Sequence, residues 1–163
     1  MAAKAFYIAE AGINLGINQL NTLINTDMLN TVNTMNPQVL SNKAQSAVTN
    51  ADGITFLMDT VKKNGTAQLI LNGANAEYTV NSTAFGSGNY QYKIIISEKS
   101  NPSATGTDKW KLEYYYTINS TGSSSAETKK IVLTGDFTVE VQRDNFAKFA
   151  LFTDHHGTPS GGT

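Results

Sequence analysis

The sequence predicts an α+β protein in which a long N-terminal helix packs on an antiparallel β-meander of about four strands, with a second helix between. Two patterns predict this fold class. Apolar side chains recur at helical spacing through the first 30 residues, and at every second position from Thr66 to about residue 143. Short turn-rich segments separate the alternating runs. Such short connections favour antiparallel neighbours, because a parallel crossover needs a dozen or more residues.

The composition predicts one domain and excludes several kinds of site. The chain has 163 residues, 40% of them hydrophobic, which is enough for a core. Only 15% of residues are charged and the formal net charge is −1, so no nucleic-acid partner is expected. The chain has no cysteine, which excludes disulfides and thiolate metal sites. We expect the domain to span residues 1–152 and a flexible, Gly-rich tail to occupy residues 153–163.

The first element is a helix predicted over residues 1–30. No Ser, Thr, Asp or Asn precedes the pattern to cap it, so the helix starts abruptly, like the second half of a longer one. Gly12 and Gly16 lie on one side of it. These glycines could allow close packing against another subunit's helix. Alternatively, they are simply tolerated, or they present a flat helix face to the aromatic rings of the sheet. Apolar side chains form one stripe along the helix, at Phe6, Ile13, Ile17, Leu20 and Ile24. Of these, Ile13, Ile17, Leu20 and Ile24 are expected to dock on the sheet.

A helical connection is predicted over residues 37–65. Pro37 suits the first position of a helix, and Thr49 with Asp52 resembles a capping pair for a second, clearer helix. The apolar residues of that helix follow the spacing i, i+3, i+4, i+7 at Ile54, Leu57, Met58 and Val61.

The antiparallel sheet is predicted over residues 66–143 and a short closing helix over residues 144–152. In the most regular strand, polar residues alternate with an apolar set assigned to the helix-to-sheet core: Trp110, Leu112, Tyr114 and Tyr116. Tyr115 lies on the opposite face and is the better candidate for a surface contact. Gly135 and Asp136 interrupt the last strand, where a bulge or bend is expected.

The segment Ala5–Asn14 carries a resemblance to a known family. Its sequence, Ala-Phe-Tyr-Ile-Ala-Glu-Ala-Gly-Ile-Asn, resembles the part of the first helix that follows the membrane-spanning half in type IV pilins. The closest likeness is to minor pilins with an aromatic pair followed by Ala-Glu-Ala-Gly. The segment Asp144–Thr153 also resembles a stretch of large pilin-like surface proteins. The chain is therefore expected to be a soluble fragment that lacks the apolar N-terminal half of the first helix.

The resemblance implies a structural subunit of a type IV pilus or pilus-like (pseudopilus) assembly, similar to a minor pilin, with other pilin subunits as its partners. It implies an inner-membrane anchor before assembly and a place in a cell-surface or extracellular filament afterwards. Residues before about Gly12 are then expected to project from the globular domain. The residues expected to contact neighbouring subunits are Phe6, Tyr7, Ile8, Ala9, Ala11, Gly12 and Gly16.

A second class of function stays open, namely a carbohydrate-binding or adhesive cell-surface module that uses exposed aromatic side chains on surface glycans. Catalysis is not expected, because the sequence has no nucleophile elbow, phosphate-binding loop or dinucleotide fingerprint, and its carboxylates are spread along the strands. No metal or cofactor is expected either. The only two histidines, His155 and His156, are adjacent, so in an extended chain their side chains point in opposite directions.

Overall fold

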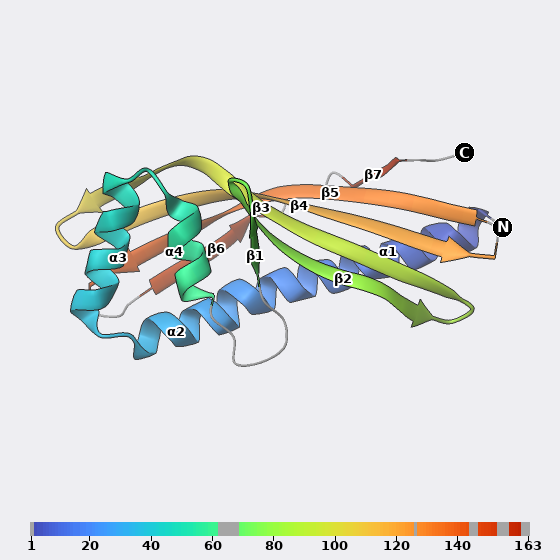
Figure 1. The fold of residues 1–163 in the computed structure, drawn as a ribbon, viewed down its shortest axis with the longest axis horizontal. Helices are drawn as coiled ribbons and strands as arrows, with labels where there is room; N and C mark the ends of the chain where they lie inside the picture. The colour runs from blue at the N-terminus through green and yellow to red at the C-terminus, as the bar shows by residue number, and fades with distance from the viewer. Residues whose placement is uncertain (1, 62–68, 126, 144–146, 153–156, 161–163) are drawn as a thin grey trace.

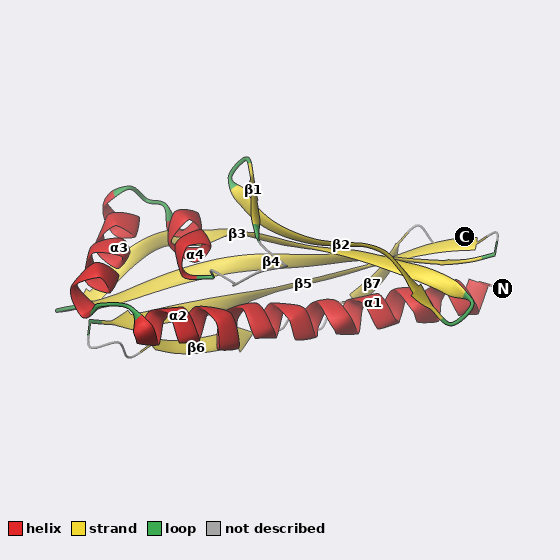
Figure 2. Ribbon diagram, turned by 60° about the horizontal axis from the view of Figure 1, so that its bottom comes forward, coloured by secondary structure: helices red, strands yellow, loops and turns green. Residues whose placement is uncertain are grey.

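A long N-terminal helix lies along one face of an antiparallel sheet in the computed structural model, which describes residues 2–61, 69–125, 127–143, 147–152 and 157–160 (Figure 1). Two shorter helices cover the same face at the end of the molecule away from the N-terminus (Figure 2). The α+β fold class is therefore confirmed. The expected count of about four strands is too low, because the sheet has seven described strands.

The N-terminal helix continues without a break from Ala2 to Thr34. It consists of α1 (Ala2–Thr22), one π-helical turn η1 (Leu23–Met28) and α2 (Leu29–Thr34). At 1.5 Å per residue it is roughly 50 Å long. In and after the wider π-helical turn, four apolar residues face the sheet and are each at most 1% exposed: Leu23, Ile24, Met28 and Val32. The predicted range 1–30 ends four residues too early.

Two short helices form the predicted connection, α3 (Pro37–Thr49) and α4 (Gly53–Thr60). Pro37 is the first residue of α3, and the Asn36 side chain caps this helix by accepting a hydrogen bond from the Gln38 N–H at 2.8 Å. Asp52 caps α4 by accepting from the Thr55 N–H at 3.0 Å. Residues 62–65, the end of the predicted range, lie outside the described residues.

Polar contacts fix these short helices to the sheet. The buried Tyr114 hydroxyl donates to the backbone oxygen of Gly53 at 2.7 Å. Glu98 accepts hydrogen bonds from the first N–H groups of α4, at 2.5 Å from Gly53 and 3.3 Å from Ile54. A carboxylate there also complements the positive end of the helix dipole. Trp110 Nε1 donates to Gln45 of α3 at 3.1 Å.

The sheet is an antiparallel meander in the order β1-β2-β3-β4-β5-β6, with β7 also paired to β5. Strands β6 and β7 lie end to end along β5, opposite Val141–Asp136 and Leu133–Lys130. The strands are β1 (Ile70–Asn72), β2 (Asn75–Phe85), β3 (Gly88–Gly106), β4 (Lys109–Ser124), β5 (Glu127–Gln142), β6 (Ala147–Phe152) and β7 (Gly157–Ser160).

Three expectations about the C-terminal part are corrected. The closing helix predicted at 144–152 is wrong, because residues 147–152 form strand β6 along the free edge of β5. The tail predicted at 153–163 contributes strand β7 at residues 157–160. No bulge interrupts β5 at Gly135, which pairs in register with Tyr116. A Cβ at Gly135 would overlap the Tyr116 ring, so glycine makes room for that ring.

Candidate functional site

The N-terminal helix packs unusually close to the sheet because both surfaces carry small residues where they meet. A Cβ added at Gly122 of β4 would overlap backbone atoms of Ala5 and Ala9 in α1. At the next contact, a Cβ on Gly12 would overlap the Ser120 hydroxyl, which itself donates a hydrogen bond to the Ala9 backbone oxygen at 2.8 Å. The backbones of helix and sheet are therefore in direct contact over the first part of α1.

The aromatic side chains of β3 complete this contact. Tyr92 lies 3.4 Å and Tyr90 3.6 Å from the Cβ positions of Gly16 and Gly12, respectively. Both glycines thus let side chains of the chain's own sheet approach the helix, most closely Ser120 at Gly12 and Ile118 at Gly16. The expected contact of these glycines with another subunit's helix is wrong, because the chain's own sheet covers both positions.

The structure also corrects the assignment of other residues that were expected to contact neighbouring subunits. Ile8 is 4% exposed and Ala9 is fully buried, because the sheet of the same chain covers them. Phe6 is partly buried against the core. Residues before Gly12 do not project from the globular domain, since α1 is already packed on β4 at Ala5. That expectation is wrong. Of the seven residues, Tyr7, which is 64% exposed, and the half-buried Ala11 have side chains on the outer half of the helix.

A regular row of side chains lies on the outer face of the helix, opposite the sheet. We call it the outer seam; it consists of Tyr7, Ala11, Asn14, Asn18, Asn21 and Asn25. Successive members are four, three, four, three and four residues apart, which is the spacing of one helix-packing seam. All except Ala11 are exposed. The four asparagines were not singled out from the sequence, although their spacing was visible in it.

The outer face of this helix has very little charge. Between Ala2 and Thr26 the only charged residues are Lys4 and Glu10, and neither belongs to the outer seam. A helix face that stays in water usually carries many charged residues, often in opposite-sign pairs one turn apart. Here amide side chains take their place, and Asn25 Nδ2 donates to Asn21 Oδ1 along the seam. The composition of this outer helix face is therefore typical of a surface that another protein covers.

The residues of the predicted helix-to-sheet core lie on the helix-covered face of the sheet, where Trp110 and Tyr114 bond to α3 and α4. Ile17 is partly buried against the core, and the other residues of this set are buried: Ile13, Leu20, Ile24, Trp110, Leu112, Tyr114 and Tyr116. Because Trp110 is 5% exposed and hydrogen-bonded to Gln45, its ring offers no platform for a sugar.

Tyr115 is the exposed aromatic residue on the opposite face of the sheet, with 49% of its surface accessible. The Lys99 ammonium lies 5.7 Å from the centre of its ring and is held there by Asp136 at 2.6 Å. The hydrogen bond to Asp136 raises the pKa of Lys99, so this cation stays charged over the ring. A sugar that stacked on Tyr115 from this side would have to displace the ion pair.

A row of aromatic rings lines the edge between the helix and strands β2 and β3. Tyr78 and Tyr90 each stack on Tyr92, with ring centres 6.5 and 6.3 Å apart, and Phe85 meets Tyr90 edge to face. Burial, with the neighbouring tyrosines, raises the pKa of Tyr92 to about 12, and burial with nearby Asp27 raises that of Tyr78. The Tyr78 and Tyr92 hydroxyls therefore stay protonated at neutral pH, and their rings pack against one another.

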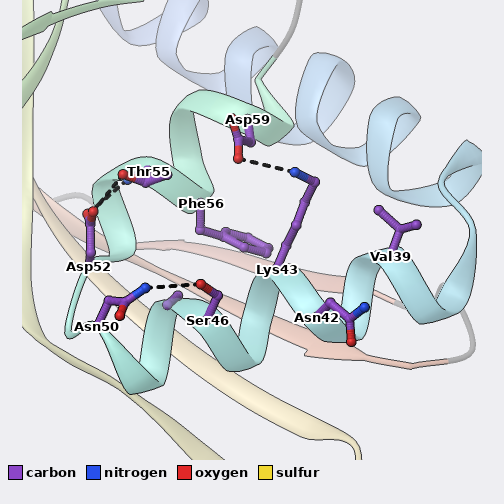
Figure 3. Close-up of a pocket in the computed structure, with 10 residues that line it drawn as sticks. Val39, Asn42, Lys43, Ser46, Asn50, Asp52, Thr55, Phe56 and Asp59 are labelled. Carbon is purple, nitrogen blue, oxygen red and sulfur yellow. Dashed lines mark hydrogen bonds and ion pairs between the residues drawn. The ribbon is translucent and has the colours of Figure 1, made fainter.

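A cleft of about 370 Å³ lies between α3 and α4 (Figure 3). Its polar side chains pair with one another across and along the two helices. Lys43 of α3 bonds Asp59 of α4 at 3.2 Å, Asp52 accepts from the Thr55 hydroxyl at 2.6 Å, and Asn50 donates to Ser46 at 3.1 Å. The hydrogen bonds from Thr55 lower the pKa of Asp52, which stabilises its ionised, capping form. These groups join the helices together and cap α4.

The described residues contain no group of three or more His, Asp or Glu side chains placed to hold a metal ion. His155 and His156 lie outside the described residues. Within the same residues, none of the helices combines the length and the apolar character that crossing a bilayer requires.

Comparison with known proteins identifies one similarity. The model of a family described as a domain of unknown function, DUF4900, matches residues 109–163. The match starts at β4 and includes β5, β6 and β7, so it covers the C-terminal part of the sheet and about a third of the chain. No curated protein and no solved structure matches the chain.

Proposed function

We propose that this protein is a structural subunit of a type IV pilus or pilus-like assembly, similar to a minor pilin, and that it acts by helix-mediated packing with other pilin subunits. The observation that carries the proposal is the outer seam. It is a nearly charge-free face on a helix of roughly 50 Å whose opposite face is already packed on the sheet. The resemblance of Ala5–Asn14 to the pilin first helix supports the same function.

The proposed contact differs from the one that the sequence predicted. Tyr7 and Ala11 stay in it, and the asparagines of the outer seam extend it toward Asn25. Buried amide side chains in a helix–helix seam pair across the interface, and they fix its register at some cost in stability. A seam of this kind suits a subunit that must adopt one position in a filament. It also suits an isolated chain that associates only weakly.

Under this proposal, the protein lies in a cell-surface or extracellular filament and is anchored in the inner membrane before assembly. The proposal further predicts that the gene encodes an apolar run of about 20 residues upstream of Met1, the length that spans a bilayer as a helix. If subunits packed only through their sheets, no such apolar run would be needed.

The test uses the product of the complete gene in its own host. Surface filaments are sheared from the cells, and the amount of this protein in them is measured with an antibody against the isolated chain. Asn14→Glu combined with Asn21→Glu adds two charges to the outer seam, so we expect the protein to be lost from the filaments while its amount in cells is unchanged. The matched control, Thr134→Glu with Gln142→Glu, adds two charges on the outer sheet face.

Normal incorporation of the seam variant would rule out helix-mediated packing through this face. Loss of the control variant alone would place the subunit contact on the sheet. If neither the normal protein nor the variants occurred in any surface filament, the proposed function itself would be wrong.

The carbohydrate-binding alternative loses its main support, because Trp110 is buried and the Tyr115 ring is covered by Lys99 on one side. Titration with neutral glycans while Trp110 fluorescence is followed is expected to give no change in emission.

A further inference from the structure

A hollow of about 450 Å³ lies on the sheet face that points away from the N-terminal helix, across strands β2 to β5. Its polar side chains come from four neighbouring strands: Asn81, Gln91, Lys93, Asn119, Thr121 and Lys130. The strand register places them in two parallel rows. Lys93 is opposite Asn119 in one row, and Gln91, Thr121 and Lys130 follow one another in the other.

Several polar side chains of this hollow have no partner among the described residues. Within the described residues, the side chains of Gln91, Asn119 and Thr121 make no hydrogen bond, and Lys130 makes no ion pair. Lys93 is 3.5 Å from Glu77, a carboxylate beside the hollow, and among the described residues no Asp or Glu lines the hollow itself. The contrast with the cleft between α3 and α4 is clear, because the polar groups there are paired with one another.

We propose that this hollow binds an acidic polysaccharide, in which carboxylate groups pair with Lys93 and Lys130 while sugar hydroxyls bond the amide and hydroxyl side chains. Amides and hydroxyls both donate and accept hydrogen bonds, and so do sugar hydroxyls. Two ammonium groups, of which only Lys93 has a carboxylate partner among the described residues, favour a negatively charged ligand.

A nucleic acid fits the hollow less well than an acidic polysaccharide. Single-stranded nucleic acids bind on aromatic side chains that stack on the bases, within grooves of many positive charges. The hollow has two lysines, and its one aromatic lining residue, Tyr92, is 7% exposed because its side chain lies on the helix side of the sheet. Recognition therefore rests on charge and hydrogen bonds.

The location of the hollow is compatible with the proposed assembly but does not depend on it. A subunit whose outer seam faces its neighbours turns the opposite sheet face outward, where a polymer can reach it. The isolated chain carries the whole hollow, so binding can be measured without filaments. Loss of binding with normal incorporation into filaments would overturn this inference alone.

The test is isothermal titration of the isolated chain with polygalacturonate oligomers, with the same oligomers after methyl esterification, and with single-stranded DNA. We expect binding of the free acid only, with an affinity that falls as salt is added. Lys130→Gln and Lys93→Gln should each weaken it about fivefold, as expected for the loss of one exposed ion pair. Lys111→Gln is the matched control, since it removes one charge from the same sheet face outside the hollow.

Several outcomes would overturn the inference. They are the absence of polygalacturonate binding at millimolar concentration, equal binding of the esterified oligomer, tighter binding of DNA, and an affinity that Lys130→Gln leaves unchanged. Thermal unfolding of each variant, followed by circular dichroism, verifies that the fold is retained. Both lysines have solvent-accessible ammonium groups, so we expect their variants to unfold within about 3 °C of the normal chain.

Discussion

Replacing Gly122 with alanine tests how closely the N-terminal helix packs on the sheet. The added methyl group would overlap backbone atoms of Ala5 and Ala9 and lie 3.0 Å from the Ala9 Cα. Backbone atoms cannot rotate away as a side chain can, so the helix must shift away from β4. We therefore expect Gly122→Ala to destabilise the fold.

The expected loss has two parts. Overpacking of a well-filled contact costs about 1–3 kcal/mol. A shift of the helix also lengthens the 2.8 Å hydrogen bond from the Ser120 hydroxyl to the Ala9 oxygen, which contributes about 1 kcal/mol. Together they predict a loss of about 2–4 kcal/mol in the free energy of unfolding.

The assay is urea denaturation at 25 °C followed by circular dichroism, with the normal chain beside the variant. Gly106→Ala is the matched control, since Gly106 is also a strand glycine and its added Cβ would lie 3.6 Å from the Lys109 side chain, an ordinary contact. We expect this control to stay within about 0.5 kcal/mol of the normal chain. Equal stability of Gly122→Ala and Gly106→Ala would refute the close-packing argument.

Other predictions follow from the same contacts. Gly12→Ala should lower the free energy of unfolding less than Gly122→Ala does, because its Cβ meets the rotatable Ser120 hydroxyl and the higher helix propensity of alanine offsets about 1 kcal/mol. Adding Ser120→Ala should recover part of the loss in the same denaturation assay. Asp52→Ala should cost about 1 kcal/mol at pH 7. Because the pKa of Asp52 is lowered in the folded chain, its contribution to stability is present above the pKa of the unfolded chain, near 4, and disappears as the pH falls through the folded pKa. Denaturation of the normal chain and the variant at pH 7 and pH 2.5 tests this. Tyr92 and Tyr114 have raised pKa values, so absorbance at 295 nm should show fewer than seven ionised tyrosines at pH 11 in the native chain and all seven in urea. The same shifts predict that stability, complete below pH 10, falls as the pH rises toward 12.

The sequence was sufficient for the fold class because its two periodicities are strong. Trp110, Leu112, Tyr114 and Tyr116 alternate cleanly, and this alternation alone assigns them to one buried face. The start of α3 at Pro37 was also readable, since it rests on local chemistry. The expected capping pair was right only for Asp52, which caps α4, whereas Thr49 is the last residue of α3.

The missed features depend on long-range packing. Residues 147–152 have apolar spacing that a helix or a strand can satisfy, and the free edge of β5 decides in favour of a strand. Gly135 suggested a bulge, but its partner in the register is Tyr116, whose ring needs the space. Similarly, nothing local shows that Gly12 meets Ser120, more than one hundred residues away in the sequence.

The candidate site was predicted in part. The sequence indicated the first helix, which carries the outer seam, but its two faces were assigned from the apolar residues alone. Ile8 and Ala9 were placed in a subunit contact, whereas they pack on the sheet of the same chain. The outer seam contains four asparagines, which are usually interpreted as solvated residues. Their regular spacing becomes informative once the opposite face is known to be buried.

The accessibility of Asn18 in assembled filaments tests the central claim most directly. Because the chain has no cysteine, Asn18→Cys and the control Thr134→Cys each introduce one thiol, whose rate of maleimide labelling can be compared between isolated chain and filament. We predict that assembly slows labelling at position 18 at least tenfold and leaves position 134, on the outer sheet face, nearly unchanged. Equal labelling at position 18 in both states would contradict assembly through the outer seam.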